Sequence, residues 1–177
     1  SAIRARPGAP WRLACADYSK DNFMIDAEQL TADLETHYIE GIAREGNTPF
    51  KCALISRVEE NLWQGGCRDG VNLQGYFKNI ISLYPWGIYH VHDHQVHTET
   101  ALFDAEDGVD EERVILLAHY VNLCRERGMT LVHCQAGLNR SALVATYALI
   151  LGGRTPEEAI SLMRERRCDA VLCNQGF

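Results

Sequence analysis

The chain has 177 residues, of which 46% are hydrophobic, and its formal net charge at pH 7 is -7. This length supplies one domain with a substantial core and is too short for two ordinary domains. Because the net negative charge repels polyanions, neither nucleic acid nor an anionic membrane is an expected partner.

The seven cysteines form an odd, scattered set without a C-x-x-C pair, at positions 15, 52, 67, 124, 134, 168 and 173. Such a set suits neither a secreted disulfide framework nor a structural zinc site. The longest apolar stretch, residues 142–151, is about half as long as a bilayer span requires, and residue 1 opens no signal-peptide pattern. We therefore expect a soluble, cytoplasmic protein with reduced thiols.

The first predicted element is a helix over residues 26–46. Apolar side chains recur there one helical turn apart, among them Tyr38 and Ile42. We therefore predict an N-terminal helical extension over residues 1–48, packed on a single main domain over residues 49–177.

Short apolar or alternating runs predict strands along the main domain. They comprise a pair joined by a turn within residues 52–66, a buried strand in 79–86, an alternating segment at 87–97 and a β-rich run at 129–133. Further along the chain, these runs are separated by stretches with helical patterns.

The clearest of the predicted helices spans residues 110–127, with Asp110 as its N-cap. A second spans about 139–151, and a third begins where Thr155 and Glu158 can form a capping box. Strands that alternate with helices predict an α/β fold, with a mainly parallel central sheet flanked by helices and with the extra N-terminal helix.

The sequence LVHCQAGLNRSAL, residues 131–143, places a thiol and a guanidinium six positions apart in the loop between a predicted strand and a predicted helix. Ligands of open α/β sheets bind at the carboxyl ends of strands, and a helix N-terminus there attracts anions. The same donors stabilise a thiolate at Cys134. Gly137 allows the tight backbone turn, and Arg140 can hold two phosphate oxygens with its planar fork. The loop is therefore a predicted oxyanion site with a nucleophile.

The motif HCQAGLNRS resembles the signature of the cysteine-dependent protein tyrosine phosphatases, which is His-Cys, five residues, then Arg-Ser or Arg-Thr. NLWQGG is similar to the early strand of the compact dual-specificity phosphatases, and RRCDAVLCNQGF to their closing segment. The resemblance covers roughly residues 52–177. It implies a dual-specificity phosphatase-like fold and the hydrolysis of phosphate monoesters without a cofactor.

The resemblance also implies roles for single residues. Cys134 would be the nucleophile that forms a phosphocysteine, and Ser141 would assist departure of the thiolate in the second step. The phosphoryl group would be bound by the loop residues Gln135, Ala136, Gly137, Leu138, Asn139 and Arg140. Ser141 could instead satisfy the first turn of the helix. His133 would orient the loop and tune the thiol, or be a buried histidine that is merely hydrogen-bonded.

The family also needs an aspartic acid on a separate loop as general acid, about thirty residues before the cysteine. Asp104 lies thirty residues before Cys134 and follows an apolar pair, so it is the leading candidate. Asp107 is the alternative, Asp93 comes next, and Asp110 is better explained as the helix cap.

A histidine cluster comprises His90, His92, His94 and His97, and the first three share one face of a predicted strand. They could converge on a metal, but the family needs none, and histidines beside such a loop more often pack or contact substrate. RERR at 164–167 is similarly better explained as a charged helix end than as a docking patch.

Three functions remain after these observations. The favoured one is a phosphatase that hydrolyses phosphotyrosine on proteins, with phosphoserine and phosphothreonine as further candidates. A phosphoinositide or RNA 5′-phosphatase would use the same chemistry. A phosphoprotein-binding module without turnover is the third, and the intact Cys134 and Arg140 argue against it. The expected partners are a phosphorylated protein and oxyanions such as phosphate, sulfate or vanadate in the active site.

Overall fold

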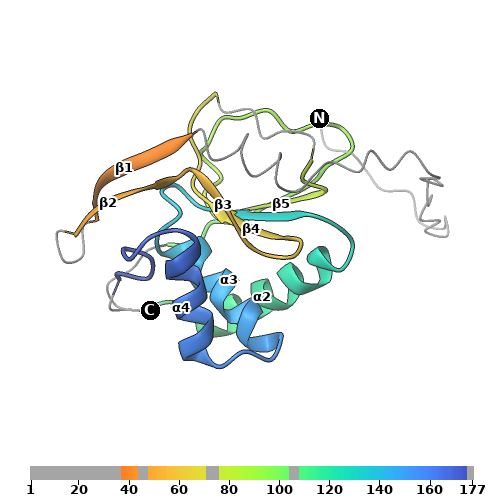
Figure 1. Ribbon diagram of the computed structural model, residues 1–177. Coiled ribbons are helices and arrows are strands. Elements are labelled where there is room, and N and C mark those ends of the chain that lie inside the picture. The colour runs from red at the N-terminus through yellow and green to blue at the C-terminus, as the bar shows by residue number, and fades with distance from the viewer. Residues whose placement is uncertain (1–36, 44–47, 71–75, 104–107, 175–177) are drawn as a thin grey trace.

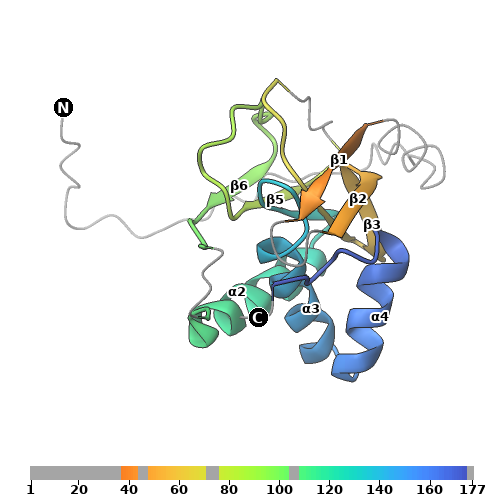
Figure 2. The same cartoon turned by 90° about the vertical axis from the view of Figure 1, so that its left-hand side faces the viewer.

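The computed structural model describes residues 37–43, 48–70, 76–103 and 108–174. Its strands are β1 (Tyr38–Ala43), β2 (Thr48–Ala53), β3 (Ile55–Glu59), β4 (Leu62–Gly65), β5 (Asn79–Ser82), β6 (Val96–Glu99) and β7 (Thr130–His133). Its helices are α2 (Glu111–Arg125), α3 (Arg140–Leu151) and α4 (Pro156–Arg166). The described helices lie together on one side of the larger sheet in both perpendicular views (Figures 1 and 2).

The central sheet has five strands in the order β3-β4-β7-β5-β6, and only the β3–β4 pair is antiparallel. The expected mainly parallel sheet is therefore confirmed. In the register of the central strand β7, His133 pairs with both Gly65 and Ser82. The carboxyl ends of β4, β5 and β7 consequently meet at one edge, and Cys134 is the first residue beyond it.

Both faces of the sheet are buried at the three central strands β4, β7 and β5, as their apolar sequences require. On β7, Val132 belongs to the main core cluster with α2 and α3, whereas Leu131 belongs to a second cluster that includes Trp63 and Phe77. Leu131 and Val132 are both completely buried. Because successive residues of a strand face opposite sides, β7 is held from both sides, which makes a rigid base for the loop that follows.

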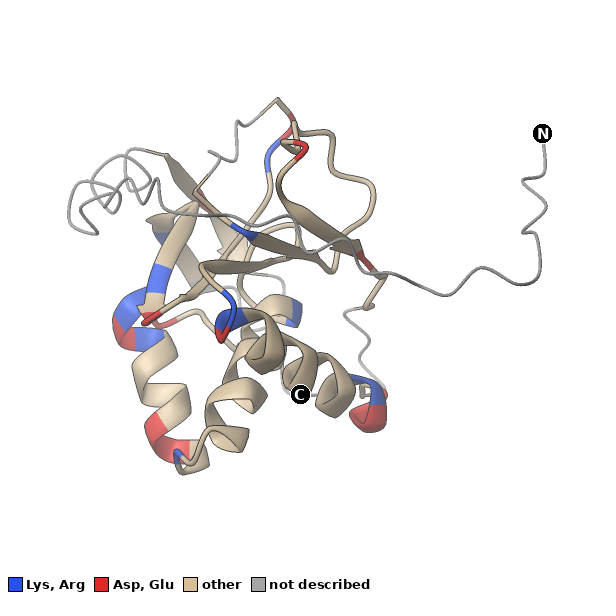
Figure 3. Cartoon of the chain, turned by 90° about the vertical axis from the view of Figure 1, so that its right-hand side faces the viewer, with Lys and Arg blue, Asp and Glu red and all other residues tan. Residues whose placement is uncertain are grey.

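The predicted helices are confirmed together with their caps. The Asp110 side chain accepts a hydrogen bond from the Arg113 amide at the start of α2, and Thr155 forms a reciprocal capping box with Glu158 at the start of α4. α4 carries acidic residues in its first turn and basic residues in its last turn, so its charges gather at the two ends (Figure 3). This arrangement complements the helix dipole and agrees with the interpretation of residues 164–166 as a charged helix end, whereas Arg167, the C-cap residue, is buried.

The predicted helix over residues 26–46 is wrong in its last part. Residues 26–36 lie outside the described residues, but Tyr38–Ala43 form strand β1, which pairs antiparallel with β2. A spacing of four residues puts Tyr38 and Ile42 on one face of a helix, and because four is even, it also puts them on one face of a strand. The hairpin β1–β2 crosses residue 48, where we predicted the extension to end, and that domain boundary remains a prediction.

The predicted strand over residues 87–97 is also wrong in most of its length, because only Val96–Glu99 forms β6. The Gln95 side chain donates to the Phe77 carbonyl and accepts from the His92 amide, each at 2.8 Å. Side-chain hydrogen bonds of this kind compete with a strand ladder. Among the described residues, no helix is both long and apolar enough to cross a membrane.

Candidate active site

The loop between β7 and α3 packs directly against the end of β4. Gly137 has a φ of +73°, and a Cβ built there would lie 2.4 Å from the Gly65 carbonyl carbon. Only glycine fits both the conformation and the space. The glycine thus allows the loop to pack closely against the end of β4.

Four carbonyl groups of the loop accept hydrogen bonds from donors on the side away from its concave surface. Their bonds are His133 Nδ1 to Cys134 O (3.3 Å), Cys67 N to Gln135 O (2.9 Å), Gln64 Nε2 to Gly137 O (3.0 Å) and Leu172 N to Leu138 O (2.9 Å). A trans peptide is planar, so the next N–H points away from each of these partners. The amides after these four carbonyls therefore turn away from the scaffold, as an oxyanion cradle requires.

The Cys134 thiol is 2% exposed and lies at the N-terminus of α3. Its sulfur accepts hydrogen bonds from the Gly137 amide at 3.3 Å and from the Ser141 hydroxyl at 3.2 Å. Ser141 Oγ also lies 3.2 Å from the Gly65 carbonyl oxygen and accepts from Gln64 Nε2 at 2.6 Å. The sulfur therefore has two hydrogen-bond donors and lies near the positive end of the helix dipole.

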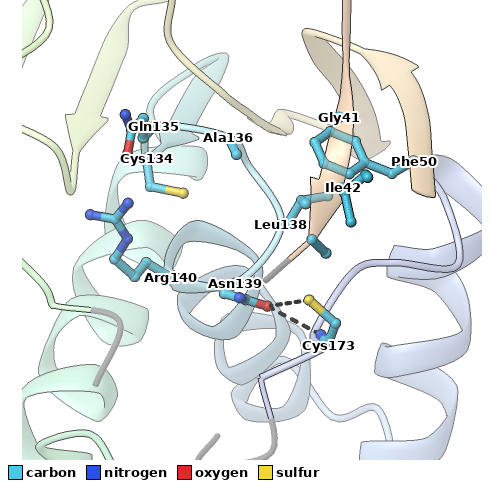
Figure 4. A pocket seen from close by; sticks show the side chains of 11 residues that line it. Gly41, Ile42, Phe50, Cys134, Gln135, Ala136, Leu138, Asn139, Arg140 and Cys173 are labelled. Carbon is cyan, nitrogen blue, oxygen red and sulfur yellow. Dashed lines mark hydrogen bonds between the residues drawn. The ribbon is translucent and has the colours of Figure 1, made fainter. Parts of the chain in front are cut away.

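Arg140, the first residue of α3, directs its guanidinium to the same side of the loop as the Cys134 sulfur (Figure 4). Its Nη1 donates to the Leu102 carbonyl oxygen at 3.3 Å, and its Cζ lies 5.7 Å from the Tyr84 ring centroid. Arg140 is therefore steered by contacts on one side, with its planar fork beside the thiol.

A chain of hydrogen bonds extends from the loop through His133. Burial lowers the pKa of His133 to about 4, so the ring is neutral at pH 7. Since the Cys134 carbonyl can only accept from Nδ1, the proton belongs on Nδ1, and Nε2 accepts from the Tyr89 hydroxyl at 2.6 Å. The Tyr89 oxygen in turn accepts from His97 Nε2 at 2.9 Å. Tyr89 thereby fixes the tautomer of His133 that orients the Cys134 peptide.

Asn139 connects the loop to the C-terminal segment. Its Oδ1 accepts from the backbone amides of Cys173 at 3.1 Å and Asn174 at 3.3 Å. The loop is consequently anchored to β4, to the segment after α4 and to the sheet edge at the same time.

The loop forms one side of a cavity of about 470 Å³. The other side comes from the β1–β2 hairpin and consists of Gly41, Ile42, Ala43 and Phe50 (Figure 4). Sequence reasoning missed these residues because it assigned part of the hairpin to a helix. It also missed Gln64 and Tyr89, whose partners lie 73 and 44 residues away along the chain.

A second apolar surface lies on the Arg140 side. The Tyr84 and Trp86 ring centroids are 5.3 Å apart, and those of Trp86 and Phe103 are 6.1 Å apart. Trp86 is 56% exposed and Phe103 is 64% exposed, so both rings are available to an incoming group.

The structure brings together Cys134, Ser141 and the six predicted phosphoryl-binding residues 135–140. Asp104 and Asp107 lie outside the described residues. Asp110 caps α2, and Asp93 is exposed in a turn. Leu102, two residues before Asp104, nevertheless reaches the site, because its carbonyl oxygen accepts a hydrogen bond from Arg140.

The histidine cluster is partly assembled. The ring centroids of His90 and His92 are 4.6 Å apart, and those of His92 and His94 are 5.6 Å apart. Within the part of the chain that the structure describes, however, no group of three or more His, Cys, Asp or Glu residues is arranged to hold a metal ion.

Residues 112–177 match the family model described as the dual specificity phosphatase catalytic domain. No curated protein matches the chain significantly. The match includes the motif, α3, α4 and the closing segment, so the resemblance to the cysteine-dependent protein tyrosine phosphatases of the compact dual-specificity type is confirmed.

The fold is similar to that of several solved structures. Human DUSP28 is 20% identical, with 63% of this chain and 82% of that chain covered and a TM-score of 0.54. A cysteine-to-serine variant of Pseudomonas aeruginosa TpbA in complex with phosphotyrosine is 17% identical, with 63% and 72% covered and a TM-score of 0.51. PTPMT1 in complex with PI(5)P is 16% identical, with 64% and 83% covered and a TM-score of 0.51.

These structural similarities establish the fold. The match of residues 112–177 to a dual-specificity phosphatase catalytic domain supports a cysteine-based phosphatase.

Proposed function

We propose that the protein is a protein phosphatase that hydrolyses phosphotyrosine, and phosphoserine and phosphothreonine as a dual-specificity enzyme does, through a phosphocysteine intermediate. The observation that carries the proposal is the juxtaposition of the Cys134 thiol, a cradle of backbone amides and the Arg140 guanidinium in one cavity. This set supplies a nucleophile and the charge stabilisation that phosphoryl transfer needs.

In the first step the Cys134 thiolate attacks phosphorus while the amides of residues 135–140 and the Arg140 fork hold the equatorial oxygens. Asp104 protonates the leaving oxygen. The contact between Leu102 and Arg140 supports this role for Asp104, since it brings the chain two residues before that carboxyl group to the reacting centre. Asp107 is the alternative acid.

In the second step water attacks the phosphocysteine, and the same carboxylate takes its proton. The Ser141 hydroxyl, 3.2 Å from Cys134 Sγ, donates to the departing thiolate. Gln64 supports this geometry because its amide donates to the Ser141 oxygen, which leaves the hydroxyl proton free for the sulfur or for the Gly65 carbonyl.

The cavity lining favours a monophosphate on an apolar group over a polyphosphorylated substrate. Of the described residues that line the cavity, Arg140 is the single charged one, and Ile42 and Phe50 form an apolar wall opposite the loop. A phosphoinositide headgroup or an RNA 5′-triphosphate has several phosphates, each of which needs cationic partners. The alternative substrates use the same chemistry but find fewer complementary charges here.

Steady-state hydrolysis tests the proposal directly. We expect turnover of a phosphotyrosine peptide and of p-nitrophenyl phosphate, with slower release of phosphate from phosphatidylinositol phosphates or a 5′-triphosphorylated RNA. Faster turnover of either alternative substrate would reassign the substrate class. Binding of the phosphopeptide without any turnover would instead support the phosphoprotein-binding module.

Substitution of the nucleophile provides the matched control. Cys134→Ser should lose at least about 10³-fold in kcat and retain binding of the phosphotyrosine peptide, because a serine hydroxyl fits the loop but is a far weaker nucleophile. Trapping of phosphorus on Cys134 during turnover, detected by mass spectrometry after acid quench, would identify the intermediate. Near wild-type turnover by the variant would exclude the covalent mechanism.

We further propose that the oxyanions phosphate, sulfate and vanadate bind in the cradle and that the enzyme works in the cytosol. The six cysteines among the described residues are free thiols, as is usual in a reducing compartment. Competitive inhibition by vanadate tests the first of these statements.

A further inference from the structure

A positive charge is buried behind the catalytic loop. Arg167, at the end of α4, is 8% exposed. Its Nη1 donates to the Gln64 carbonyl at 3.0 Å and to Ser56 Oγ at 3.3 Å, and its Nη2 donates to Cys52 Sγ at 3.4 Å. Among the ion pairs that the described residues form, none includes Arg167. A buried guanidinium without a carboxylate needs another source of negative charge.

Two thiols beside Arg167 can supply that charge. Cys52 on β2 is 3% exposed, whereas Cys168, directly after Arg167, is half-buried. Their side chains share a hydrogen bond, which lowers the pKa of Cys168 to about 6, and the Arg167 guanidinium acts in the same direction. The hydrogen bond that Cys52 donates, together with its burial, raises the pKa of Cys52. The hydrogen bond and the guanidinium thus favour the thiolate at Cys168 and the thiol at Cys52.

We propose that Cys168 and Cys52 are a thiol-oxidation site separate from the active-site cysteine, in which accessible Cys168 reacts first and buried Cys52 then closes a reversible disulfide. Two sulfurs in hydrogen-bond contact next to a guanidinium are arranged for this chemistry, because the positive charge favours a thiolate and the second sulfur is already adjacent. The proposal does not depend on the substrate or activity proposed above.

The oxidant is a hydroperoxide. The Cys168 thiolate attacks one oxygen, the O–O bond breaks, and the other oxygen leaves and takes a proton from water. Cys168 is then a sulfenic acid, oxidised by two electrons, and the peroxide is reduced. The Cys52 sulfur next attacks Cys168 sulfur, the S–O bond breaks, and hydroxide leaves as water with the proton from Cys52. A thiol reductant reverses the disulfide by exchange.

The site is connected to the catalytic loop through a single residue. Arg167 donates to the Gln64 carbonyl, and the Gln64 side chain donates to the Gly137 carbonyl and the Ser141 hydroxyl. A disulfide removes the thiolate that compensates Arg167, so the guanidinium must shift toward its remaining acceptors. Where the proposed phosphatase activity holds, we expect oxidation at this site to slow the second step, in which Ser141 acts.

The chemical test uses the full chain with Cys134→Ser, so that the active-site thiol cannot react. Treatment with hydrogen peroxide at pH 7, followed by alkylation, proteolysis and mass spectrometry, should yield a peptide that joins residues 52 and 168 and disappears with dithiothreitol. Before oxidation, iodoacetamide should label Cys168 about tenfold or more faster than Cys67. Cys67 is the matched control, since it is also half-buried and burial raises its pKa to about 11.

Cys168→Ser and Cys52→Ser in the same background identify the partners. Each should abolish the joined peptide, and Cys52→Ser should leave Cys168 as a stable sulfenic acid that dimedone traps. Circular dichroism shows whether each variant folds, and the labelling comparison needs no variant at either position. Labelling of Cys168 no faster than Cys67, or oxidation that never joins residues 52 and 168, would overturn the proposal. Because the measurements use a variant without turnover, their outcome is independent of the proposed phosphatase function.

Discussion

Single side chains decide how the loop handles charge, and Arg140 is the clearest case. Its guanidinium lies on the same side of the loop as the Cys134 sulfur (Figure 4), and contacts with the Leu102 carbonyl and the Tyr84 ring fix its direction. A planar fork in a fixed direction can grip two phosphate oxygens in the ground state and keep both as the transition state forms.

Arg140→Lys should therefore lower kcat/KM for a phosphotyrosine peptide by roughly 10²–10³-fold, because an ammonium keeps the charge but loses the bidentate geometry. Stopped-flow or steady-state kinetics would measure the loss. Arg113→Lys, on α2 and outside the lining of the cavity, is the matched control and should remain near wild type. A loss of less than a few fold in Arg140→Lys would mean that the guanidinium does not hold the phosphoryl group.

The general acid can be identified by its dependence on the leaving group. General acid catalysis contributes about 10²–10⁴-fold and matters most when the leaving group is poor. Asp104→Asn should thus cripple kcat/KM for a phosphotyrosine peptide and affect that for p-nitrophenyl phosphate much less. Asp107→Asn, measured side by side, is the control. If only Asp107→Asn shows the substrate-dependent loss, the acid lies three residues further on, and if neither does, Asp93 is the next candidate.

Two elements, the catalytic loop and the β1–β2 hairpin, form the cavity together. The loop supplies the polar side, and the β1–β2 hairpin supplies the apolar side, with Gly41 and Phe50 opposite each other in the register. A Cβ at Gly41 would lie 3.3 Å from the Phe50 ring, so the glycine gives the ring its room. This hairpin is placed to contact the part of a substrate that carries the phosphate.

Phe50→Ala should raise KM for a phosphotyrosine peptide about fivefold, as expected from roughly 1 kcal/mol of lost apolar contact. Inhibition by vanadate should not change, because the oxyanion is held by the loop. Lys51→Ala is the matched control, since Lys51 lies on the same strand with a largely exposed side chain paired with Glu40. Equal effects of Phe50→Ala on vanadate and on the peptide would show that the hairpin supports the loop and does not contact the substrate.

The catalytic loop was predictable from the sequence, and the hairpin was not. Strand 130–133, the Gly137 turn and helix 140–151 depend on local patterns: a β-rich run, a glycine and a capped apolar stretch. The prediction for the hairpin failed because the spacing of Tyr38 and Ile42 fits a helix and a strand equally. Only pairing with β2 decides between the two structures. Gln64, Tyr89 and Arg167 support the site through contacts across 44 to 103 residues of sequence, which no local pattern encodes.

The molecule as a whole positions the site through buried polar groups, and this carries a consequence for its stability. His133 is completely buried at the end of the central strand, where it connects the sheet to Tyr89 and to the Cys134 carbonyl. Burial lowers its pKa from 6.5 to about 4. The folded state therefore binds a proton at His133 less readily than the unfolded chain does.

Stability should consequently fall as the pH drops from about 6.5 to about 4, because in this window the unfolded state binds more protons than the folded state. The difference of about 2.5 between the two pKa values corresponds to a loss of roughly 3 kcal/mol. Urea unfolding at pH 7.5 and pH 5 would measure the change. Burial raises the pKa of Glu59, but hydrogen bonds from Arg125 and Arg154 outweigh it and lower this pKa below 4.5. Glu59 therefore contributes to the pH dependence only at more acidic pH.

His133→Asn should reduce this pH dependence, whereas His119→Asn, at an exposed position of α2, should leave it intact. If His133→Asn does not fold, Tyr89→Phe gives a second route. That variant removes the hydroxyl that donates to Nε2 of the neutral ring, so it should lower the free energy of unfolding at pH 7.5. A free energy of unfolding that Tyr89→Phe leaves unchanged at pH 7.5, or a pH dependence that is the same in the wild type and in His133→Asn, would show that the buried histidine does not couple the loop to the stability of the fold.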